Sequence, residues 1–415
     1  MTHPTREVSR SPRSSSAGST ALRILVLSHV PLVRELGEGR VCVELTEEFR
    51  KLGHMVETFD CRDAFPGDRP ARWHRLFPLR FRAKARDFLR REGGRFDIID
   101  ALHGVGPLPK REVGFEGLLV ARSAGLYAFY QQNLDYQRIT WPDRLPGTRA
   151  GQLVARWTQH RAAMACKESL RNADLINVSN EDELMYVTEE LGLGHKSVFL
   201  PLGVSPEHAS ALADTAANAS ERLERKEVVF VGAWSLRKGA ADWGAIVRLT
   251  RSMVPGVRFR FLGTGVDETS VLADLRLPRD EGLTVVPHYA APQLPSLLSR
   301  SAVGALPSYI EGWPLGVLEQ LAAGIPTVAY DVPGPRSMLK DSDYELLCPA
   351  GDVERFSRLL ARNLTLSTPE YGVLAAQCRA IASKFLWPEI AKATVDRYSR
   401  AIRELRDVVG AETWR

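Results

Sequence analysis

The sequence has few cysteines, and no two of them lie close together. Five cysteines occur in 415 residues, at positions 42, 61, 166, 348 and 378. None belongs to a C-x-x-C motif, so neither a zinc site nor a redox pair is indicated. Their odd number and wide scatter also argue against a disulfide framework. We therefore expect a protein of the reducing cytoplasm.

Long apolar runs and a strong charge of either sign are also missing. No stretch approaches the roughly 20 apolar residues that span a bilayer. The net charge of +5 is small for this length, which argues against dedicated binding of nucleic acid. Residues 1–20 are rich in Ser and Arg but have no apolar core of a secretory signal. We expect a disordered arm there, with a transit peptide as the alternative.

The pattern that is present alternates short apolar runs with helical periodicity. A β-type run at 22–28 is followed by a loop holding Gly37 and Gly39, a helical pattern from 40 to 52 and a strand at 55–59. This order is a βαβ unit. Further strand candidates in this half lie at 96–101, 118–122 and 175–179.

The same alternation restarts at 228 after a stretch rich in Ala, Ser and charged residues. A chain of this length exceeds one core, so the sequence predicts an α/β protein with two doubly wound, Rossmann-like domains and a site between them. The expected parts are an N-terminal domain at 21–206, a linker or exposed helix at 207–226, a C-terminal domain at 227–386 and a final helix at 387–415.

Two glutamates eight positions apart mark the most informative segment, PSYIEGWPLGVLEQLAAGIP at 307–326. Glu311 precedes Gly312, Trp313 and Pro314, and a small-residue helix from Leu315 carries Glu319. A helix N-terminus offers free N–H groups and a positive dipole end to an anion. The segment predicts a phosphate site with a carboxylate on each side. The alternative is two surface glutamates beside an ordinary crossover.

The segment resembles the E-x7-E signature of the retaining "glycosyl transferases group 1" family, which has the GT-B fold and takes sugar from a nucleotide diphosphate. The resemblance extends from about residue 21 to the end and is strongest over 228–335. It implies that Glu311 contacts the donor sugar, Glu319 the ribose and the amides of 312–316 the phosphates. It also implies that the terminal helix crosses back to the N-terminal domain.

The loop VGAWSLRKG at 231–239 resembles the family's pyrophosphate-binding turn. Gly232 and Lys238 match it, but the family's arginine after the glycine is Ala233 here, with Arg237 as the nearest substitute. Cations in this loop replace a metal in the family, so no metal and no cofactor is expected beyond the nucleotide-sugar co-substrate. An exposed basic turn is the alternative.

Three further positions follow from the same resemblance. Gly37 and Gly39 match the glycine loop that approaches the donor, although G-x-G-x-x-C is not a dinucleotide fingerprint. Gly263, in FLGTG, and His288, in VPHY, match turns that meet the nucleotide.

The family's catalytic histidine is replaced in this chain. The matching segment reads RSAGL, with Ala124 where the family has histidine. His103, in DALHG after the preceding strand, is the candidate to compensate. A structural histidine beside a glycine is the alternative.

Residues 69–95 form a strongly basic stretch, with Trp73, Phe77, Phe81 and Phe88 among the arginines. Such a mixture suits an anionic acceptor or a peripheral place on the inner face of the membrane. A helical excursion whose aromatic residues pack on the domain explains it equally.

We therefore expect a metal-independent glycosyltransferase that acts on a sugar, lipid or small-molecule acceptor. An epimerase or a phosphorylase on the same scaffold, or an impaired nucleotide-sugar-binding protein, remain alternatives, since fold does not fix function.

Overall fold

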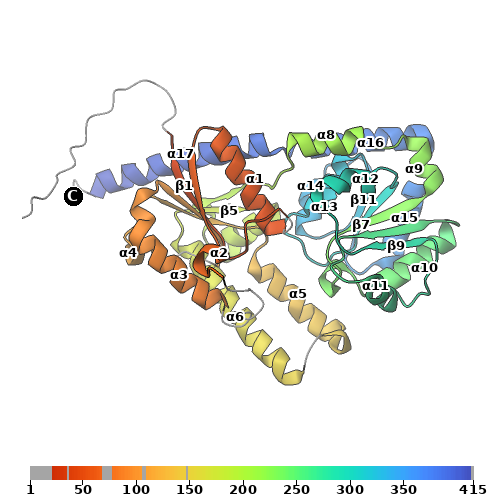
Figure 1. The fold of residues 1–415 in the computed structure, drawn as a ribbon, viewed down its shortest axis with the longest axis horizontal. Helices are drawn as coiled ribbons and strands as arrows, with labels where there is room; N and C mark the ends of the chain where they lie inside the picture. The colour runs from red at the N-terminus through yellow and green to blue at the C-terminus, as the bar shows by residue number, and fades with distance from the viewer. Residues whose placement is uncertain (1–20, 35–36, 68–76, 105–108, 146–147, 413–415) are drawn as a thin grey trace, which may run out of the picture.

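Two parallel six-stranded sheets with helices on both faces form the body of the protein (Figure 1). The structure is a computed structural model, and it describes residues 21–34, 37–67, 77–104, 109–145 and 148–412. The expected arm at 1–20, like Trp73, lies outside these ranges. The part of the chain that the structure describes has no helix long and apolar enough to cross a bilayer.

The N-terminal sheet has the strand order β2-β1-β3-β4-β5-β6. Its strands are β1 (Arg23–Leu27), β2 (Met55–Phe59), β3 (Ile98–Leu102), β4 (Leu118–Arg122), β5 (Leu175–Val178) and β6 (Ser197–Phe199). Its helices are α1 (Gly37–Lys51), α2 (Cys61–Ala64), α3 (Phe77–Glu92), α4 (Lys110–Val113), α5 (Tyr127–Thr140), α6 (Arg149–Asn172) and α7 (Glu181–Met185). Strands β1, β3, β4 and β5 are almost wholly buried, as parallel strands covered on both faces must be.

The C-terminal sheet has the order β12-β11-β10-β7-β8-β9, so β7, its first strand, lies between β8 and β10. Its strands are β7 (Glu227–Val231), β8 (Arg258–Leu262), β9 (Leu283–Val286), β10 (Val303–Leu306), β11 (Thr327–Tyr330) and β12 (Leu347–Cys348). The helices around it are α10 (Trp243–Met253), α11 (Glu268–Leu275), α12 (Leu294–Leu298), α13 (Leu315–Ala322), α14 (Pro333–Leu339), α15 (Val353–Leu364) and α16 (Thr368–Ala382). This is the Rossmann strand order, and its topological switch point lies between β7 and β10.

The stretch 207–226 is not an exposed linker. It forms α8 (Pro206–Asp214) and α9 (Ala219–Arg225), which pack against α12, α13 and α16. The Arg222 side chain is buried and donates hydrogen bonds to the carbonyls of Ser299 and Gly324. These buried hydrogen bonds attach the segment to the C-terminal body.

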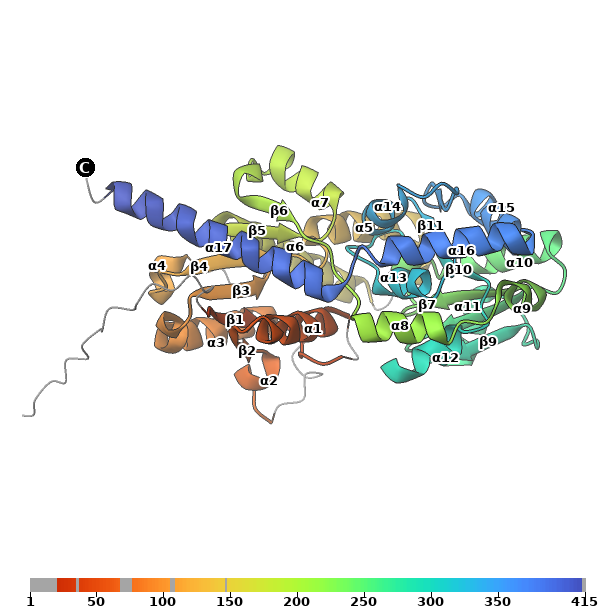
Figure 2. The same ribbon diagram turned by 90° about the horizontal axis from the view of Figure 1, so that it is seen from above.

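The chain passes between the two bodies at two places that lie side by side. Val204 N–H donates to the Phe385 carbonyl at 3.0 Å, and Trp387 N–H donates to Val204 at 3.1 Å. Beyond this point α17 (Trp387–Glu412) packs against α1 and β4 (Figure 2). Tyr398 of α17 hydrogen-bonds both members of the buried Arg122–Asp100 ion pair. The terminal helix thus belongs to the N-terminal body.

The structure corrects one local expectation and agrees with one of two alternatives. Gly37 and Gly39 lie in the first turn of α1 rather than in a loop before it. A side chain at position 39 would come within 2.3 Å of the Pro31 carbonyl oxygen, so the folded-back 28–34 segment requires glycine. For the basic stretch at 69–95, the described part agrees with the packing alternative, because Phe81 and Phe88 of α3 pack against Phe59.

Candidate active site

The carboxyl ends of β7 and β10 bring the basic loop and the first glutamate together. Lys238 lies in a short 3-10 turn (Leu236–Lys238) after β7, and Glu311 in the loop between β10 and α13. Gly239 ends the turn at φ +82°, and a side chain there would come within 2.3 Å of the Pro307 carbonyl oxygen. Glycine therefore allows the two loops to touch at the switch point.

Glu311 is buried and paired with two cations. Its Oε1 lies 2.5 Å from Lys238 Nζ and 3.3 Å from Arg237 Nη1. Burial alone would raise the pKa of Glu311, but the two neighbouring cations outweigh it and hold that pKa below its usual range. Burial lowers the pKa of Lys238, and the carboxylate opposes this effect. Together Glu311, Lys238 and Arg237 carry a net positive charge, so they can bind an anionic ligand in addition to the Glu311 carboxylate.

Helix α13 begins directly after this cluster. Pro314 caps it without a side-chain hydrogen bond, and its backbone hydrogen bonds begin with Val317 N–H to the Pro314 carbonyl. The amides of Leu315 and Gly316 therefore precede the first turn of bonding, as an anion site at a helix N-terminus requires. Gly316 allows the helix to approach β7, because a side chain there would come within 3.1 Å of the Val231 carbonyl oxygen.

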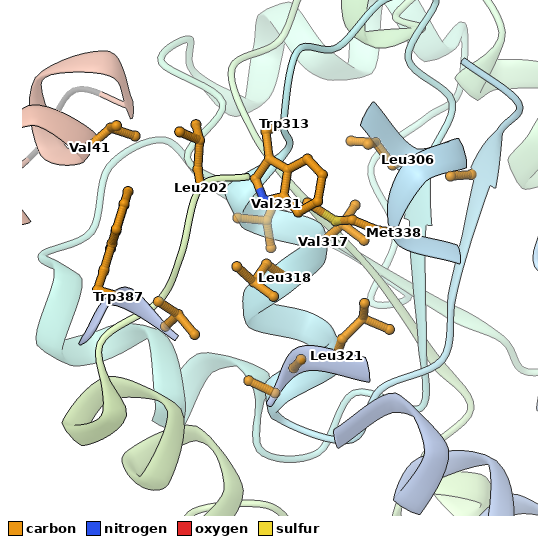
Figure 3. Close-up of a cluster of buried hydrophobic side chains, with 14 of the residues drawn as sticks. Val41, Leu202, Val231, Leu306, Trp313, Val317, Leu318, Leu321, Met338 and Trp387 are labelled. Atoms are coloured by element: carbon orange, nitrogen blue, oxygen red, sulfur yellow. The ribbon is translucent and has the colours of Figure 1, made fainter. Parts of the chain in front are cut away.

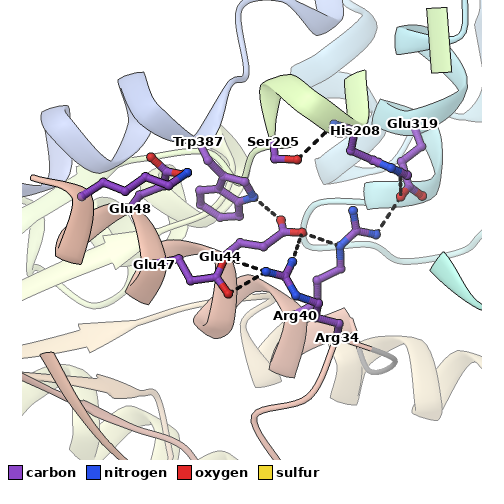
Figure 4. Close-up of polar contacts among 10 residues, drawn as sticks. Arg34, Arg40, Glu44, Glu47, Glu48, Ser205, His208, Glu319 and Trp387 are labelled. Atoms are coloured by element: carbon purple, nitrogen blue, oxygen red, sulfur yellow. Dashed lines mark hydrogen bonds and ion pairs between the residues drawn. The ribbon is translucent and has the colours of Figure 1, made fainter. Parts of the chain in front are cut away.

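Glu319, in the second turn of α13, reaches across to the N-terminal body (Figure 4). Its Oε1 lies 2.7 Å from Arg40 Nη1 of α1 and 3.1 Å from His208 Nε2 of α8. Arg40 also binds Glu44, and Glu44 accepts from the Trp387 indole. Burial tends to raise the pKa of Glu319, but His208 and Arg40 together lower it.

Gly312 is the closest approach of the E-x7-E loop to the N-terminal body. A side chain there would lie 2.4 Å from the Ala124 carbonyl oxygen and 2.6 Å from Gly125 Cα. The Gly312 carbonyl accepts from Asn180 Nδ2 at 2.9 Å. The segment that carries Ala124 at the position matched to the family histidine thus lies directly against the E-x7-E loop.

Trp313 does not line the site. Its ring is buried beside Phe385, at 4.9 Å between centroids, and near Phe199 at 6.1 Å. Figure 3 shows it above Val317 and Leu318 of α13, within the hydrophobic core. Among the predicted donor-binding residues, Trp313 is therefore a packing residue that fixes the loop.

The other predicted donor-binding positions are Gly232, Gly263 and His288, which lie in the loops after β7, β8 and β9. Gly232, at φ +154°, lies under Lys238, and an added Cβ would be 3.8 Å from its Nζ. Gly263, at φ +71°, packs against Tyr289, whose pKa is raised by burial and by the nearby charge of Glu319. The His288 side chain is exposed. Tyr289, one residue further on, is the one that faces the site.

His103 lies in a separate polar group of the N-terminal body. It follows β3, with Nδ1 3.2 Å from the Arg122 carbonyl oxygen, while its buried Nε2 has no hydrogen-bond partner within the described ranges. Burial lowers the pKa of His103, and the charge of Glu38 in α1 opposes this effect. Burial also lowers the pKa of His29, after β1, to about 4. Both imidazoles are neutral near pH 7, at the switch point of the first sheet.

Sequence reasoning missed the groups that complete the site. Arg40 and His208 hold Glu319, and Tyr130 of α5 lies under Arg237, with the guanidinium carbon 5.6 Å from its ring centroid. Only Arg40 had a local signal, since it follows the Gly37-x-Gly39 motif. The other two come from elements that the sequence gave no reason to place here.

Comparison with known proteins agrees with this geometry. Residues 225–365 match the family model for "Glycosyl transferases group 1". A D-inositol 3-phosphate glycosyltransferase of Mycobacterium avium is 32% identical over 189 residues, which are 44% of this chain and 43% of the relative. The chain thus spans less than half the length of that relative.

Solved structures match nearly the whole chain. Sucrose-phosphate synthase of Thermosynechococcus elongatus superposes with a TM-score of 0.70 at 18% identity, covering 91% of this chain and 98% of that one. The catalytic domain of starch synthase IV from Arabidopsis thaliana, bound to ADP and acarbose, gives 0.66 at 14% identity, covering 92% and 100%. At these identities the likeness shows the fold. The chain therefore has the GT-B fold, and its 225–365 segment is similar to the glycosyl transferases group 1 family.

Proposed function

We propose that this protein transfers a sugar from a nucleotide-diphosphate donor to an acceptor hydroxyl, with retention of configuration and without a metal. The observation that carries the proposal is the trio of the buried Glu311 and the half-buried Lys238 and Arg237 at the N-terminus of α13. The named relatives that transfer glycosyl groups and the ADP-bound structural neighbour support it.

The trio supplies the chemistry that departure of a nucleotide diphosphate needs. Lys238 and the amides of Leu315 and Gly316 would bind the phosphates and stabilise the negative charge that grows as the glycosidic bond breaks. Glu311 would accept hydrogen bonds from sugar hydroxyls while it keeps Lys238 charged. Arg237, held over Tyr130, takes the place of the arginine missing at Ala233.

The second carboxylate would orient the nucleoside. Glu319 is ionised and in contact with Arg40 of the opposite body, and we propose that ribose hydroxyls bind its remaining oxygen lone pairs. Donor binding would then stabilise the closed arrangement of the two bodies, since Arg40 and the ribose share one carboxylate.

The acceptor would enter from the N-terminal body. His103 and His29 offer neutral imidazoles there, able to exchange hydrogen bonds with hydroxyl groups. A sugar, a small polyol or a lipid-linked hydroxyl fits this chemistry. We also propose a reducing, cytoplasmic location, which five buried and unpaired cysteines support.

The test is a thermal-shift screen of nucleotide diphosphates and their sugars, followed by transfer assays with and without EDTA. A ligand present at 100 times its Kd should stabilise the protein by about 2.7 kcal/mol. Transfer that persists in EDTA with an anomer-retaining product supports the proposal. Absence of any shift contradicts donor binding, and donor conversion without an acceptor would indicate an epimerase instead.

A further inference from the structure

The helical hairpin of α5 and α6 projects from the body of the molecule, below both sheets in Figure 1. It holds six of the eleven large hydrophobic side chains that are exposed in the described part of the chain. They are Tyr136, Ile139, Leu153, Val154, Trp157 and Met164, of which Ile139 is 83% exposed and Leu153 68%. Single exposed hydrophobic residues are normal on a protein surface, whereas a cluster of them marks an interaction surface.

The outer part of α6 packs against α5 on one side and leaves its other face exposed. From Gly151 to Ala165 no side chain is buried, and burial begins only at Cys166. Leu153, Trp157, Arg161 and Met164 follow one another at helical spacing and form a single stripe, which we call the α6 stripe. A helix of this length gains its stability from packing of an apolar face, so an outside surface is expected to cover the stripe.

The charges on the hairpin indicate what covers it. Residues 127–172 hold seven Lys and Arg against three Asp and Glu, which accounts for +4 of the chain's +5. Arg156 and Arg161 are exposed on α6, and the Arg161 guanidinium carbon lies 6.0 Å from the Trp157 ring centroid.

Two of the three acids on the hairpin are already paired with arginines. Asp135 binds Arg138 at 2.6 Å and Glu168 binds Arg82 at 2.9 Å. The α6 stripe therefore presents cations and apolar side chains together, and it carries no carboxylate of its own.

We propose that the α6 stripe binds the surface of an anionic phospholipid bilayer. Arginines that flank an exposed Trp and Leu suit the headgroup region, where the phosphates pair with the cations and the apolar side chains enter the boundary. A second copy of this chain fits less well. A two-fold interface would bring the cationic surface of one copy, with Arg161 on the stripe and Arg156 beside it, against the same surface of the other copy, and the stripe has no carboxylate to pair with these cations.

The hairpin also joins this surface to the donor site. Tyr130, near the start of α5, lies under Arg237, and Tyr136 stacks on Tyr309 at 5.4 Å between ring centroids. A bilayer bound at α6 would thus lie beside the helix whose Tyr130 and Tyr136 contact the loops after β7 and β10. The proposal goes beyond sugar transfer and does not depend on it, because it concerns only adsorption to lipid.

Co-sedimentation of the full chain with vesicles tests the proposal. Vesicles of phosphatidylcholine with about one-third phosphatidylglycerol should bind the protein, and pure phosphatidylcholine should bind it far less, with the difference lost in high salt. R156Q/R161Q should weaken binding about 25-fold, from about fivefold for each arginine. L153S/W157S should weaken it at least tenfold. Val373→Ser on α16, equally exposed, and Arg403→Gln on α17 are matched controls that should bind as the parent does.

The outcomes separate the occupants of the stripe. All these positions are exposed, so thermal unfolding of each variant should match the parent. Vesicle binding that none of the α6 changes weakens would overturn the proposal. So would a failure to bind anionic vesicles together with a dimer in gel filtration that L153S/W157S converts to a monomer, since the stripe would then be a subunit interface.

Discussion

The ion pair between Lys238 and Glu311 offers the sharpest test of the candidate site. Lys238→Met keeps the length of the side chain but leaves Glu311, buried and ionised, with only Arg237 at 3.3 Å. Glu311→Gln keeps the shape of the loop but leaves the Lys238 ammonium buried beside another cation. The double variant removes both charges at once.

The expected magnitudes follow from these contacts. A hydrogen bond to a charged group contributes about 1.5–3 kcal/mol, so each single variant should lose about 10- to 150-fold in kcat/KM. Breaking a buried pair from one side also destabilises the protein, whereas removing both charges is often nearly neutral. The double variant should therefore recover stability, with a coupling of about 0.5–3 kcal/mol, while its transfer activity stays low.

Donor turnover and the unfolding midpoint should be measured for all four proteins. The exposed ion pair of Lys340 and Glu181, 2.5 Å apart and outside the candidate site, is the control. Its removal should change either quantity little, as surface pairs contribute about 0–1 kcal/mol. If the double variant regains activity along with stability, the pair is structural and the assignment of Glu311 and Lys238 to the donor fails.

Three further outcomes are expected. Gly312→Ala should sharply reduce turnover in a folded protein, because its methyl group would meet the Ala124 carbonyl oxygen at 2.4 Å; full activity would show that the two bodies need not close as described. Arg40→Gln should raise the KM for the donor about tenfold, the effect of about 1.4 kcal/mol, and should change kcat much less, because Arg40 orients Glu319. Steady-state kinetics measure both constants. An effect on kcat alone would contradict this expectation. Glu319→Gln should make the free energy of unfolding less sensitive to acid. The pKa of Glu319 in the folded protein lies below its ordinary 4.5. Its contribution to stability is therefore complete above pH 4.5 and is lost as the pH falls through the folded pKa. Equal acid sensitivity of both proteins in unfolding titrations would refute this.

Much of the architecture follows from local patterns. Buried runs such as 228–231 can only be parallel strands covered on both faces, and helices alternate with them. The carboxyl ends of parallel strands share one edge, so the loops after β7 and β10 had to meet once β7 and β10 were neighbours. That is why Lys238 and Glu311 could be predicted as one site from residues 73 positions apart.

Other expectations failed where the partner residues come from distant parts of the chain. Trp313 is a plausible ligand-binding residue in its motif, but Phe199 and Phe385 enclose its ring. The stretch 207–226 has the composition of a linker, yet the buried Arg222 finds the carbonyls of Ser299 and Gly324. No local pattern encodes either set of contacts.

The sequence by itself determined two Rossmann-like domains, because these depend on periodicity. A resemblance carried by the 307–326 and 231–239 segments indicated the charged residues of the loops after β7 and β10. The tertiary structure alone decided how those charges are balanced. Arg40 meets Glu319 across 279 positions of sequence, and His208 reaches it from a segment expected to be a linker or an exposed helix. It alone also left the α6 stripe uncovered, because exposure depends on what packs against a helix and not on the residues of the helix itself.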